Sequence, residues 1–556
     1  MEKEVRLPFI VSGKSIGYFA DSNNSTSYQG LFFKKDSWEL FKTIDKFISL
    51  EGKKLEESDF ELYYNYLELK KETGWLEIHL DFRFIHDYDD RGRVYSIYEE
   101  GNYLVIHYTK FKDFSLEEVE YETKTYVKGY KEYNYNEEWT KKSYDYDLSR
   151  YTKGEFYVNN GLKILPKKGM KIIFEEKGNK LFSKLKFKEK KKNGEISDKY
   201  IAFNALETLR IEKPIEGIIA GYPWFYQLWA RDELIALKPY IDRDYKFVKN
   251  VISRHFERIT EEGLLSNRYP ESELGSIDAV GWLFKRTKQF IKELRKNKNL
   301  ANVYKKYELE NMLEKSIYTI KKLYESRSNE GLIESKELET WMDTSPDSDK
   351  RKGIRVEIQF LYHSMLELCE ELSFILGKEE SFGSIEFMDL IREKLILNGK
   401  LIDGFEEKEK KTLEPIRPNV FISYYINKNL LTKEEWENTF DEVLEECWLE
   451  WGGFSSITKN HPYFQSKHTG INNKSYHRGD SWYFVNNIAA MAMKDLNKDK
   501  YKYYIEKITK ASVKDLKEQG FKNKCSEISS AEIQEAKGCW CQAWSASTLF
   551  ELILKN

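Results

Sequence analysis

The chain has 556 residues, of which 40% are hydrophobic, which is too long for one ordinary core but enough for two or three domains. Its 90 basic and 93 acidic residues give a formal net charge of -3, so the composition predicts no general attraction to nucleic acid or to an anionic membrane. Charged residues follow Met1, and no apolar run approaches the roughly 20 residues that span a bilayer, so we expect a soluble, cytoplasmic protein.

Residues 1–195 are predicted to form a β-sandwich domain. In WLEIHLDFRF, residues 75–84, apolar residues alternate with polar ones, a period of two that places one face of a strand in a core and the other in water. Residues 117–127 repeat this alternation, and residues 103–111 and 170–174 form further short apolar runs. Short strands of this kind indicate an antiparallel sandwich.

A lysine-rich stretch, residues 186–199, separates this part from the rest of the chain. It contains few apolar residues and an Asn-Gly pair, which is typical of a hairpin or a connector near a domain boundary. A run of like charge more often marks a solvated surface than a nucleic-acid site, so we assign it no partner.

Residues 196–556 are predicted to form a helical domain. Apolar residues recur at the spacing of one helix face, as in residues 244–259, where Phe247, Val251 and Ile252 share a stripe. Helix hairpins in this number build either a solenoid or a closed ring, and we find no fixed repeat of roughly 34 to 45 residues that would favour the solenoid. Comparable stripes lie in residues 282–294, 312–326, 358–376, 387–397, 434–447, 482–493, 504–516 and 544–554.

Cysteine and histidine predict neither a disulfide framework nor a metal site. The five cysteines are few and odd in number, which suits a reducing compartment. Cys539 and Cys541 form a C-x-C pair without standard zinc-ligand spacing, and His461, His468 and His477 match no familiar ligand motif. We therefore expect no cofactor and no metal.

The loops between the predicted helices hold most of the tryptophans and the unusual polar residues, so chemistry is expected there. Together these loops resemble the amylo-α-1,6-glucosidase (glycogen-debranching) family, relatives of the glucoamylases. The resemblance covers roughly residues 200–556; any single motif is weak, whereas the ordered set is specific. In chain order the motifs are GYPWFYQLWARD (221–232), SIDAVGWLF (276–284), TWMD (340–343), VEIQF (356–360), RPNV (417–420), YHRGDSWYF (476–484), SEISS (526–530) and GCWCQAWSAS (538–547).

The resemblance implies a β-sandwich followed by an (α/α)6 toroid whose loops form a sugar pocket at one rim. It implies that the charged pair Arg231 and Asp232 holds hydroxyls of the terminal glucose while aromatic residues stack on its apolar face. Such polar contacts reject sugars that leave them unpaired. For several of the other residues, packing or solvation of a helix start is an alternative role. The further sugar-contacting residues that the motifs imply are Trp224, Asp278, Trp341, Glu357, Arg417, His477 and Trp482.

Breaking an acetal with inversion requires one carboxyl group that protonates the leaving oxygen and a second, about 6.5 to 9.5 Å away, that activates water. By resemblance, Asp343 in TWMD is the general acid, and its apolar neighbours Trp341 and Met342 are expected to raise the pKa of its carboxyl group. Glu527 in SEISS is by the same resemblance the general base, which must stay ionised. An N-cap or loop role is the alternative for Asp343, and a surface role is the alternative for Glu527.

Several motif positions depart from the family pattern. LWARD replaces RWGRD, RPNV lacks the family's glutamine, VEIQ has Gln359 where asparagine is usual, and WYF lacks the proline of WPW. Both implied catalytic carboxyl residues are retained. The departures therefore affect the expected substrate preference more than the expected reaction.

The predicted function is an inverting exo-acting α-glucosidase that hydrolyses α-1,6-linked glucose branches of glycogen or limit dextrin. An α-1,4-acting glucoamylase or an oligosaccharide α-glucosidase, acting on malto- or isomalto-oligosaccharides, is an alternative on the same scaffold. A phosphorylase and a non-catalytic glucan-binding protein are further alternatives. We predict no nucleic-acid partner and no membrane partner, and the sequence does not indicate an oligomeric state.

Overall fold

The computed structural model describes residues 10–12, 16–19, 26–34, 40–52, 55–63, 65–149, 152–174, 197–212, 215–344, 351–378, 380–406, 415–470 and 473–554. The predicted boundary at residues 195 and 196 lies outside this set, as does the lysine-rich stretch up to residue 196. The chain divides into two compact units, Met1–Gly194 with Arg210–Ile215, and Glu195–Leu209 with Glu216–Asn556.

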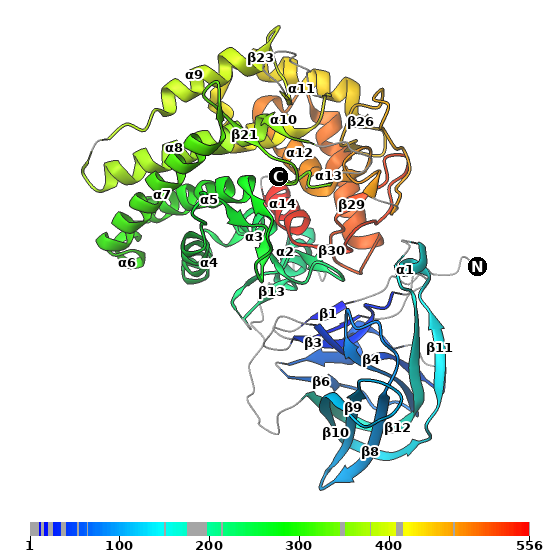
Figure 1. The fold of residues 1–556 in the computed structure, drawn as a ribbon. Helices are drawn as coiled ribbons and strands as arrows, with labels where there is room; N and C mark the ends of the chain where they lie inside the picture. The colour runs from blue at the N-terminus through cyan, green and yellow to red at the C-terminus, as the bar shows by residue number, and fades with distance from the viewer. Residues whose placement is uncertain are drawn as a thin grey trace. The chain divides into compact units, whose positions relative to one another are not determined.

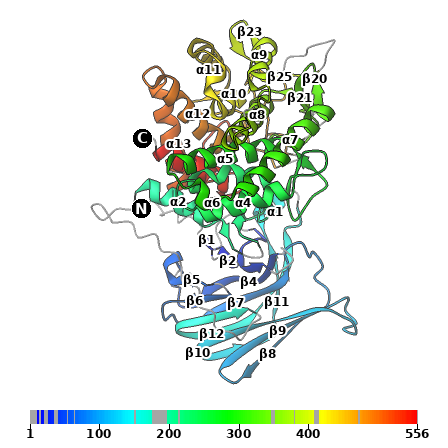
Figure 2. The same ribbon diagram turned by 90° about the vertical axis from the view of Figure 1, so that its left-hand side faces the viewer.

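The first unit is an antiparallel β domain, as predicted, and its strands β1 to β12 belong to one sheet. Nine of the twelve strands follow one another in the order β1-β2-β3-β4-β7-β12-β10-β9-β8 (Figure 2). A single sheet results because β12 is long enough to pair with β7 along its first half and with β6 along its second. The strands are β1 Ile10–Ser12, β2 Ile16–Phe19, β3 Gly30–Lys34, β4 Leu40–Ser49, β5 Phe60–Leu62, β6 Tyr66–Leu69, β7 Leu76–Phe84, β8 Arg93–Glu100, β9 Tyr103–Phe111, β10 Val119–Tyr135, β11 Trp139–Ser143 and β12 Glu155–Phe174.

The second unit contains a closed ring of six inner helices. Neighbouring members are in contact all the way round: α3 with α5, α5 with α8, α8 with α10, α10 with α12, α12 with α14, and α14 with α3. The shortest member, α3, is buried along its whole length. The inner helices are α3 Ala230–Ala236, α5 Ile277–Lys296, α8 Val356–Ile375, α10 Asn419–Ile426, α12 Tyr483–Asn497 and α14 Ala543–Leu554.

A second layer of helices lies outside this ring (Figure 1). The chain alternates between the layers, with α2 against α14, α4 against α5, α7 and α9 against α8, and α11 and α13 against α12. This alternation is the (α/α)6 arrangement and confirms the predicted fold class. None of the helices in the described residues combines the length and the apolar character needed to cross a membrane. The outer helices are α2 Asp198–Glu207, α4 Tyr245–Glu257, α7 Lys306–Arg327, α9 Ser384–Leu395, α11 Lys433–Cys447 and α13 Lys502–Glu518, and the short α6, Leu300–Val303, precedes α7.

All nine predicted helices form, with ends close to those predicted. Helix α4, for example, begins at Tyr245 because the Asp244 side chain accepts a hydrogen bond from the Phe247 N–H at 3.1 Å, which is the usual N-cap contact. Helices α2, α3 and α10 were not predicted. Both α3 and α10 are buried nearly all round, so their sequences lack the polar face that marks an amphipathic helix.

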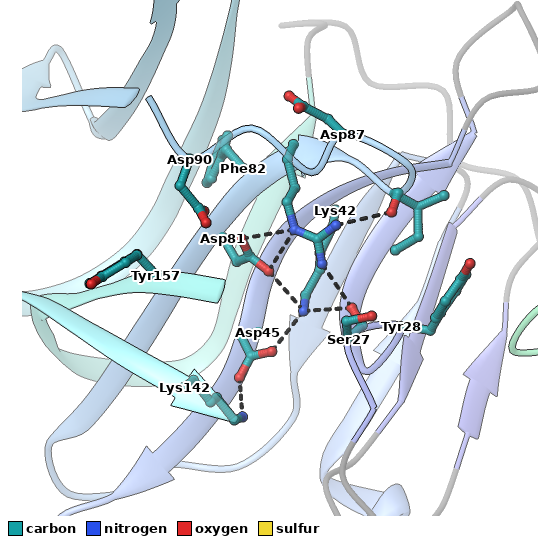
Figure 3. A network of polar contacts seen from close by, with 12 residues as sticks. Ser27, Tyr28, Lys42, Asp45, Asp81, Phe82, Asp87, Asp90, Lys142 and Tyr157 are labelled. Carbon is teal, nitrogen blue, oxygen red and sulfur yellow. Dashed lines mark hydrogen bonds and ion pairs between the residues drawn. The ribbon is translucent and has the colours of Figure 1, made fainter. Parts of the chain in front are cut away.

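The polar face of β7 is buried, whereas the alternation predicted that it faces water. Asp81 is 0% exposed and Arg83 is 2% exposed. The Asp81 carboxylate accepts hydrogen bonds from Arg83 Nε at 3.1 Å and from Arg93 Nη2 at 3.0 Å. It also lies 2.9 Å from Lys42 Nζ (Figure 3). The alternation of residue types shows which residues are polar but not whether they are buried. Here the partners that make burial of Asp81 possible, Lys42 and Arg93, come from β4 and β8.

Lys42 connects Asp81 to a second buried carboxylate, that of Asp45. Lys42 Nζ lies 2.7 Å from Asp45 Oδ1, and Lys142 pairs with the other oxygen (Figure 3). Asp45 Oδ1 also accepts a hydrogen bond from the Tyr144 hydroxyl at 2.6 Å. Burial alone would raise the pKa of both carboxyl groups, but the surrounding cations hold each pKa well below its usual range. The network therefore stays ionised inside the β domain.

Asp81→Asn is expected to destabilise the β domain by about 3 to 5 kcal/mol, because it removes one side of a buried ion pair and leaves three buried cations short of a charge. Hydrogen exchange of the β7 amides at increasing denaturant measures the change. Asp113→Asn, at an exposed turn, serves as the control and should stay within about 0.5 kcal/mol of the unaltered chain. Equal exchange in the two variants would contradict a stabilising role for the network.

Candidate active site

Short strand pairs join motifs that are far apart in the sequence. Strand β15, Gly221–Tyr222, pairs with β30, Cys541–Gln542, so the GYPWF motif lies beside the QAWS motif. Strand β28, Ser481–Trp482, pairs with β29, Ile528–Ser529, which joins the YHRGDSW motif to SEISS. The predicted motifs thus meet at the starts of the inner helices.

The starts of the inner helices carry five of the eleven predicted site residues and two further polar residues. A helix N-terminus presents free N–H groups and the positive end of the helix dipole, which stabilises nearby carboxylates. Contacts described below connect several of these helix starts to one another. In chain order the residues at or next to the six helix starts are Arg231, Asp232, Asp278, Glu357, Asn419, Trp482 and Gln542.

Arg231 does not form the expected ion pair with its neighbour Asp232. Consecutive residues of a helix point in different directions, and Arg231 is the second residue of α3. Its Nε instead donates to Asp278 Oδ2 at 2.6 Å, and its Nη1 donates to Asp343 Oδ2 at 3.3 Å. Ser276 supports this arrangement, because its hydroxyl accepts from Arg231 Nη2 and donates to Asp278 Oδ1.

Asp343, the predicted general acid, is the more exposed partner of Arg231, with 22% of its side chain accessible. It follows Trp341 and Met342, which are 3% and 2% exposed. Burial raises the pKa of the Asp343 carboxyl group, and Arg231 opposes this rise without cancelling it. The pKa of the Asp343 carboxyl group is therefore shifted upward, which is the direction that a proton donor requires and that the sequence predicted.

Glu527, the predicted general base, is 2% exposed, and both of its carboxylate oxygens accept hydrogen bonds. Tyr476 Oη donates to Oε1 at 2.5 Å, and the Cys539 backbone N–H donates to Oε2 at 2.9 Å. Two donors facing a carboxylate favour its ionised form. The surface role considered for Glu527 is therefore wrong.

Gly538 allows the close approach of the backbone to Glu527. Its φ of +62° lies in the left-handed region, and a Cβ at this position would lie 2.2 Å from Glu527 Oε2. A side chain here would displace the carboxylate, since 2.2 Å is far inside van der Waals contact.

Asp232 lies in the electrostatic field of both predicted catalytic residues. Its Oδ1 accepts from Gln542 Nε2 at 2.8 Å, which connects α3 to the start of α14. Burial raises the pKa of Asp232 well above its usual value, and the charges of Glu527 and Asp343 raise it further, against the lowering effect of Arg231. Asp343 and Glu527, although distant in sequence, both act on Asp232.

Three of the predicted aromatic and imidazole side chains form one cluster. The Trp341 ring lies 5.4 Å from His477 and 5.3 Å from Trp482, and its Nε1 donates to Asn419 Oδ1 at 3.0 Å. His477 is 2% exposed, and neither of its ring nitrogens has a hydrogen-bond partner among the described residues. Burial lowers the pKa of His477 well below its usual value, and nearby arginines such as Arg478 lower it further, so the ring is neutral.

Glu357 belongs to a buried ion network. Arg351 binds its carboxylate with two donors, at 2.7 and 3.1 Å, and also donates to Asp403 Oδ2 at 3.0 Å. The other Asp403 oxygen accepts from Asn419 Nδ2 at 2.7 Å, so the network runs from α8 to α10. A direct contact between Glu357 and a sugar stays a prediction.

Arg417 and Trp224 complete the predicted set. Arg417 Nη1 donates to the backbone carbonyls of Ser456 and His477, at 3.0 and 2.9 Å, and thereby fixes the loop that carries His477. Trp224 is half-buried and packs edge-on against Trp540, with ring centroids 5.8 Å apart.

Sequence reasoning missed several residues that hold the site together. Tyr476 and Gln542 stand inside quoted motifs, beside residues that were singled out, so their polar side chains were available as a signal. Arg351 and Asp403 lie in loops without a spacing pattern, and only the fold brings them to Glu357. Ser276 was visible as the first residue of SIDAV, but a lone serine before a helix is more often a cap.

A family model described as amylo-alpha-1,6-glucosidase matches residues 186–551, which include five of the six inner helices, α14 up to residue 551 and every site residue described above. The chain belongs to the amylo-α-1,6-glucosidase family. This confirms the family that the motifs resembled, and it makes the helical unit a glycoside hydrolase domain. A comparison with curated proteins gives no match.

Solved structures similar to this amylo-α-1,6-glucosidase family member come from Thermus thermophilus. An uncharacterized conserved protein has 13% identity and a TM-score of 0.48, over 64% of this chain and 100% of that chain. A GH63 mannosylglycerate hydrolase in complex with Tris and D-glycerate has 12% identity and a TM-score of 0.48, over 65% and 100%. The same hydrolase in complex with glucose has 12% identity and a TM-score of 0.48, over 64% and 99%.

Gly538→Ala is expected to lower hydrolase activity by about 100-fold, because the added Cβ displaces the Glu527 carboxylate and misplacement by 1 Å has an effect of this size. Initial rates of sugar release measure it. Gly377→Ala is the matched control, since Gly377 also has a left-handed φ, +72°, but nothing within 4 Å of the position of its Cβ. If both alanine variants lose activity equally, backbone strain and not the contact with Glu527 is the cause.

Proposed function

We propose that the protein is an inverting, exo-acting α-glucosidase that hydrolyses α-1,6-linked glucose branches of glycogen or limit dextrin. The observation that carries the proposal is the contrast between Asp343 and Glu527. Burial raises the pKa of Asp343, which suits a proton donor, whereas two hydrogen-bond donors face Glu527, which suits an ionised base. Both carboxyl groups raise the pKa of the same residue, Asp232, which supports a shared site.

In the proposed mechanism, Asp343 donates its proton to the glycosidic oxygen as the bond to the anomeric carbon breaks. Glu527 accepts a proton from a water molecule, and the water oxygen attacks the anomeric carbon from the opposite face. Attack from that face inverts the configuration, so an α-linked substrate gives β-glucose. Glu527 then carries the proton taken from water, and Asp343 has given its own proton to the leaving oxygen. Proton exchange with solvent restores both carboxyl groups.

The residues around Asp343 have polar groups to spare for a sugar. Three guanidinium nitrogens of Arg231 are engaged by Asp278, Asp343 and Ser276, and a guanidinium carries five N–H donors, so two donors remain for hydroxyl groups. Asp232, with its raised pKa, can donate an O–H to a sugar oxygen. These groups support recognition of a ring that is rich in hydroxyls.

His477 supplies a further reason to propose a sugar ligand. A buried imidazole without partners for its ring nitrogens is costly, and a bound hydroxyl would satisfy them. The rings of Trp341 and Trp482 beside it provide apolar surface for the C–H face of a hexose.

Digestion of panose, isomaltose and maltotriose tests the proposed linkage. We expect faster glucose release from the α-1,6 bonds of panose and isomaltose than from maltotriose, and NMR during the first turnovers should show β-glucose. Preference for maltotriose would favour the α-1,4-acting alternative, and release of α-glucose would overturn inversion. Glucose 1-phosphate formed only in the presence of phosphate would favour a phosphorylase.

Asp343→Asn and Glu527→Gln should each reduce kcat by about 100- to 10,000-fold, because each removes one half of the acid–base pair without changing shape. Initial rates on the preferred substrate measure the loss, and glucan binding should persist in both variants. Asp389→Asn and Glu532→Gln, at exposed positions, are controls with the same chemical change. Near-normal turnover in either of the first two variants would overturn the assignment of that residue.

A further inference from the structure

The loop before α12 places a tyrosine hydroxyl on the predicted base. Tyr476 Oη donates to Glu527 Oε1 at 2.5 Å, while the Cys539 N–H occupies the other oxygen at 2.9 Å. Neither the motifs nor the family match assigns a role to Tyr476. Because the two donors come from different segments, they fix both the position of the carboxylate and its rotation about the terminal bond.

Tyr476 is itself held in place from several sides. Its backbone carbonyl accepts a hydrogen bond from Trp482 Nε1 at 2.7 Å. Its ring stacks on His477, with centroids 4.9 Å apart and planes at 24°, and meets Trp482 edge-on at 4.6 Å. The next residue, His477, is anchored through its carbonyl by Arg417. The hydroxyl therefore has little freedom to leave Glu527.

The hydroxyl remains a donor across the working pH range. Burial raises the pKa of Tyr476 well above its usual value, and the charge of Glu527 raises it further. A phenol that never ionises here does not compete with Glu527 for a proton from water. It donates a hydrogen bond to Glu527 in this structure, which suits a supporting role for Tyr476 better than a role as a second base.

We propose that Tyr476 is a positioning residue that keeps the Glu527 carboxylate ionised and aimed at the attacking water. The inference deepens the proposed function and rests on it, because positioning matters for the reaction only if Glu527 is the base. A purely structural hydrogen bond would affect the stability of the fold but would leave the pH dependence of turnover unchanged.

Tyr476→Phe removes the hydroxyl and leaves the ring packing. We expect kcat to fall about 10- to 100-fold with KM within about twofold of the unaltered value, because a misaimed base slows the chemical step more than binding. The acidic limb of the rate profile should move to higher pH, since the ionised carboxylate loses a donor. Unchanged kcat and an unchanged acidic limb would overturn the proposal.

Tyr463→Phe is the matched control. Tyr463 lies in the same loop, is 47% exposed, and contacts the ring of His461 instead of a carboxylate. This variant should keep the kcat, the KM and the pH profile of the unaltered protein. If Tyr463→Phe shifts the acidic limb as far as Tyr476→Phe does, the effect belongs to the loop and the proposal is wrong.

A thermal double-mutant cycle tests the contact without relying on activity. Melting temperatures are compared for Tyr476→Phe, Glu527→Gln and the double variant, and we expect the combined shift to differ from the sum of the single shifts by about 2 °C or more, as for groups in direct contact. Additive shifts would overturn the contact. If the unaltered protein releases no sugar, the proposed function fails, and this cycle still decides whether Tyr476 holds Glu527.

Discussion

The closed ring directs six helix starts toward one rim, and this constraint determines which charges each end of the ring holds. Asp232, Asp278 and Glu357 all lie in first turns, where free N–H groups and helix dipoles stabilise negative charge. At the other ends of the inner helices the polarity is reversed. Arg286 donates to the carbonyls of Leu234 and Ile235 in the last turn of α3, and Lys285 donates to the carbonyl at the end of α10. Acidic first-turn residues therefore lie at the rim of the helix starts together with Arg231 and Arg351, whereas Lys285 and Arg286 contact carbonyls at the opposite helix ends.

Several carboxyl groups lie close together at this rim and share a small number of polar partners. The partner that each carboxyl group contacts explains why their environments differ. Arg231 neutralises Asp278 and contacts Asp343, and Arg351 binds Glu357 and Asp403. Asp232 accepts a hydrogen bond from the neutral amide of Gln542, and burial together with its anionic neighbours raises its pKa against the lowering effect of Arg231. At this rim burial raises the pKa of both Asp232 and Asp343, and Arg231 opposes the rise in each case.

The sequence predicted the parts of the fold whose residues alternate between two environments. Outer helices such as α4 have an apolar stripe and a polar face, and their periods were readable. The inner helices α3 and α10 are buried almost all round and have no such period, so they appeared only as motifs.

In β7 the alternation was correct, but Asp81 is buried because Lys42 and Arg93 reach it from other strands, and long-range partners of this kind leave no local pattern. Asp343 and Glu527 came from ordered motifs, whereas Arg351 and Asp403 became visible only through the fold.

The same limit applies to the distinction between acid and base. Aspartate and glutamate carry the same functional group, and neither TWMD nor SEISS encodes which one keeps a proton. The distinction depends on donors supplied by other segments: Asp343 has one guanidinium contact, at 3.3 Å, against the effect of burial, whereas Glu527 has a phenol and a backbone N–H at shorter distances. The shorter contacts exist because Gly538 leaves room for the chain to approach and because Trp482 and His477 hold Tyr476 in place. Loops between the inner helices therefore supply the donors that contact the Glu527 carboxylate.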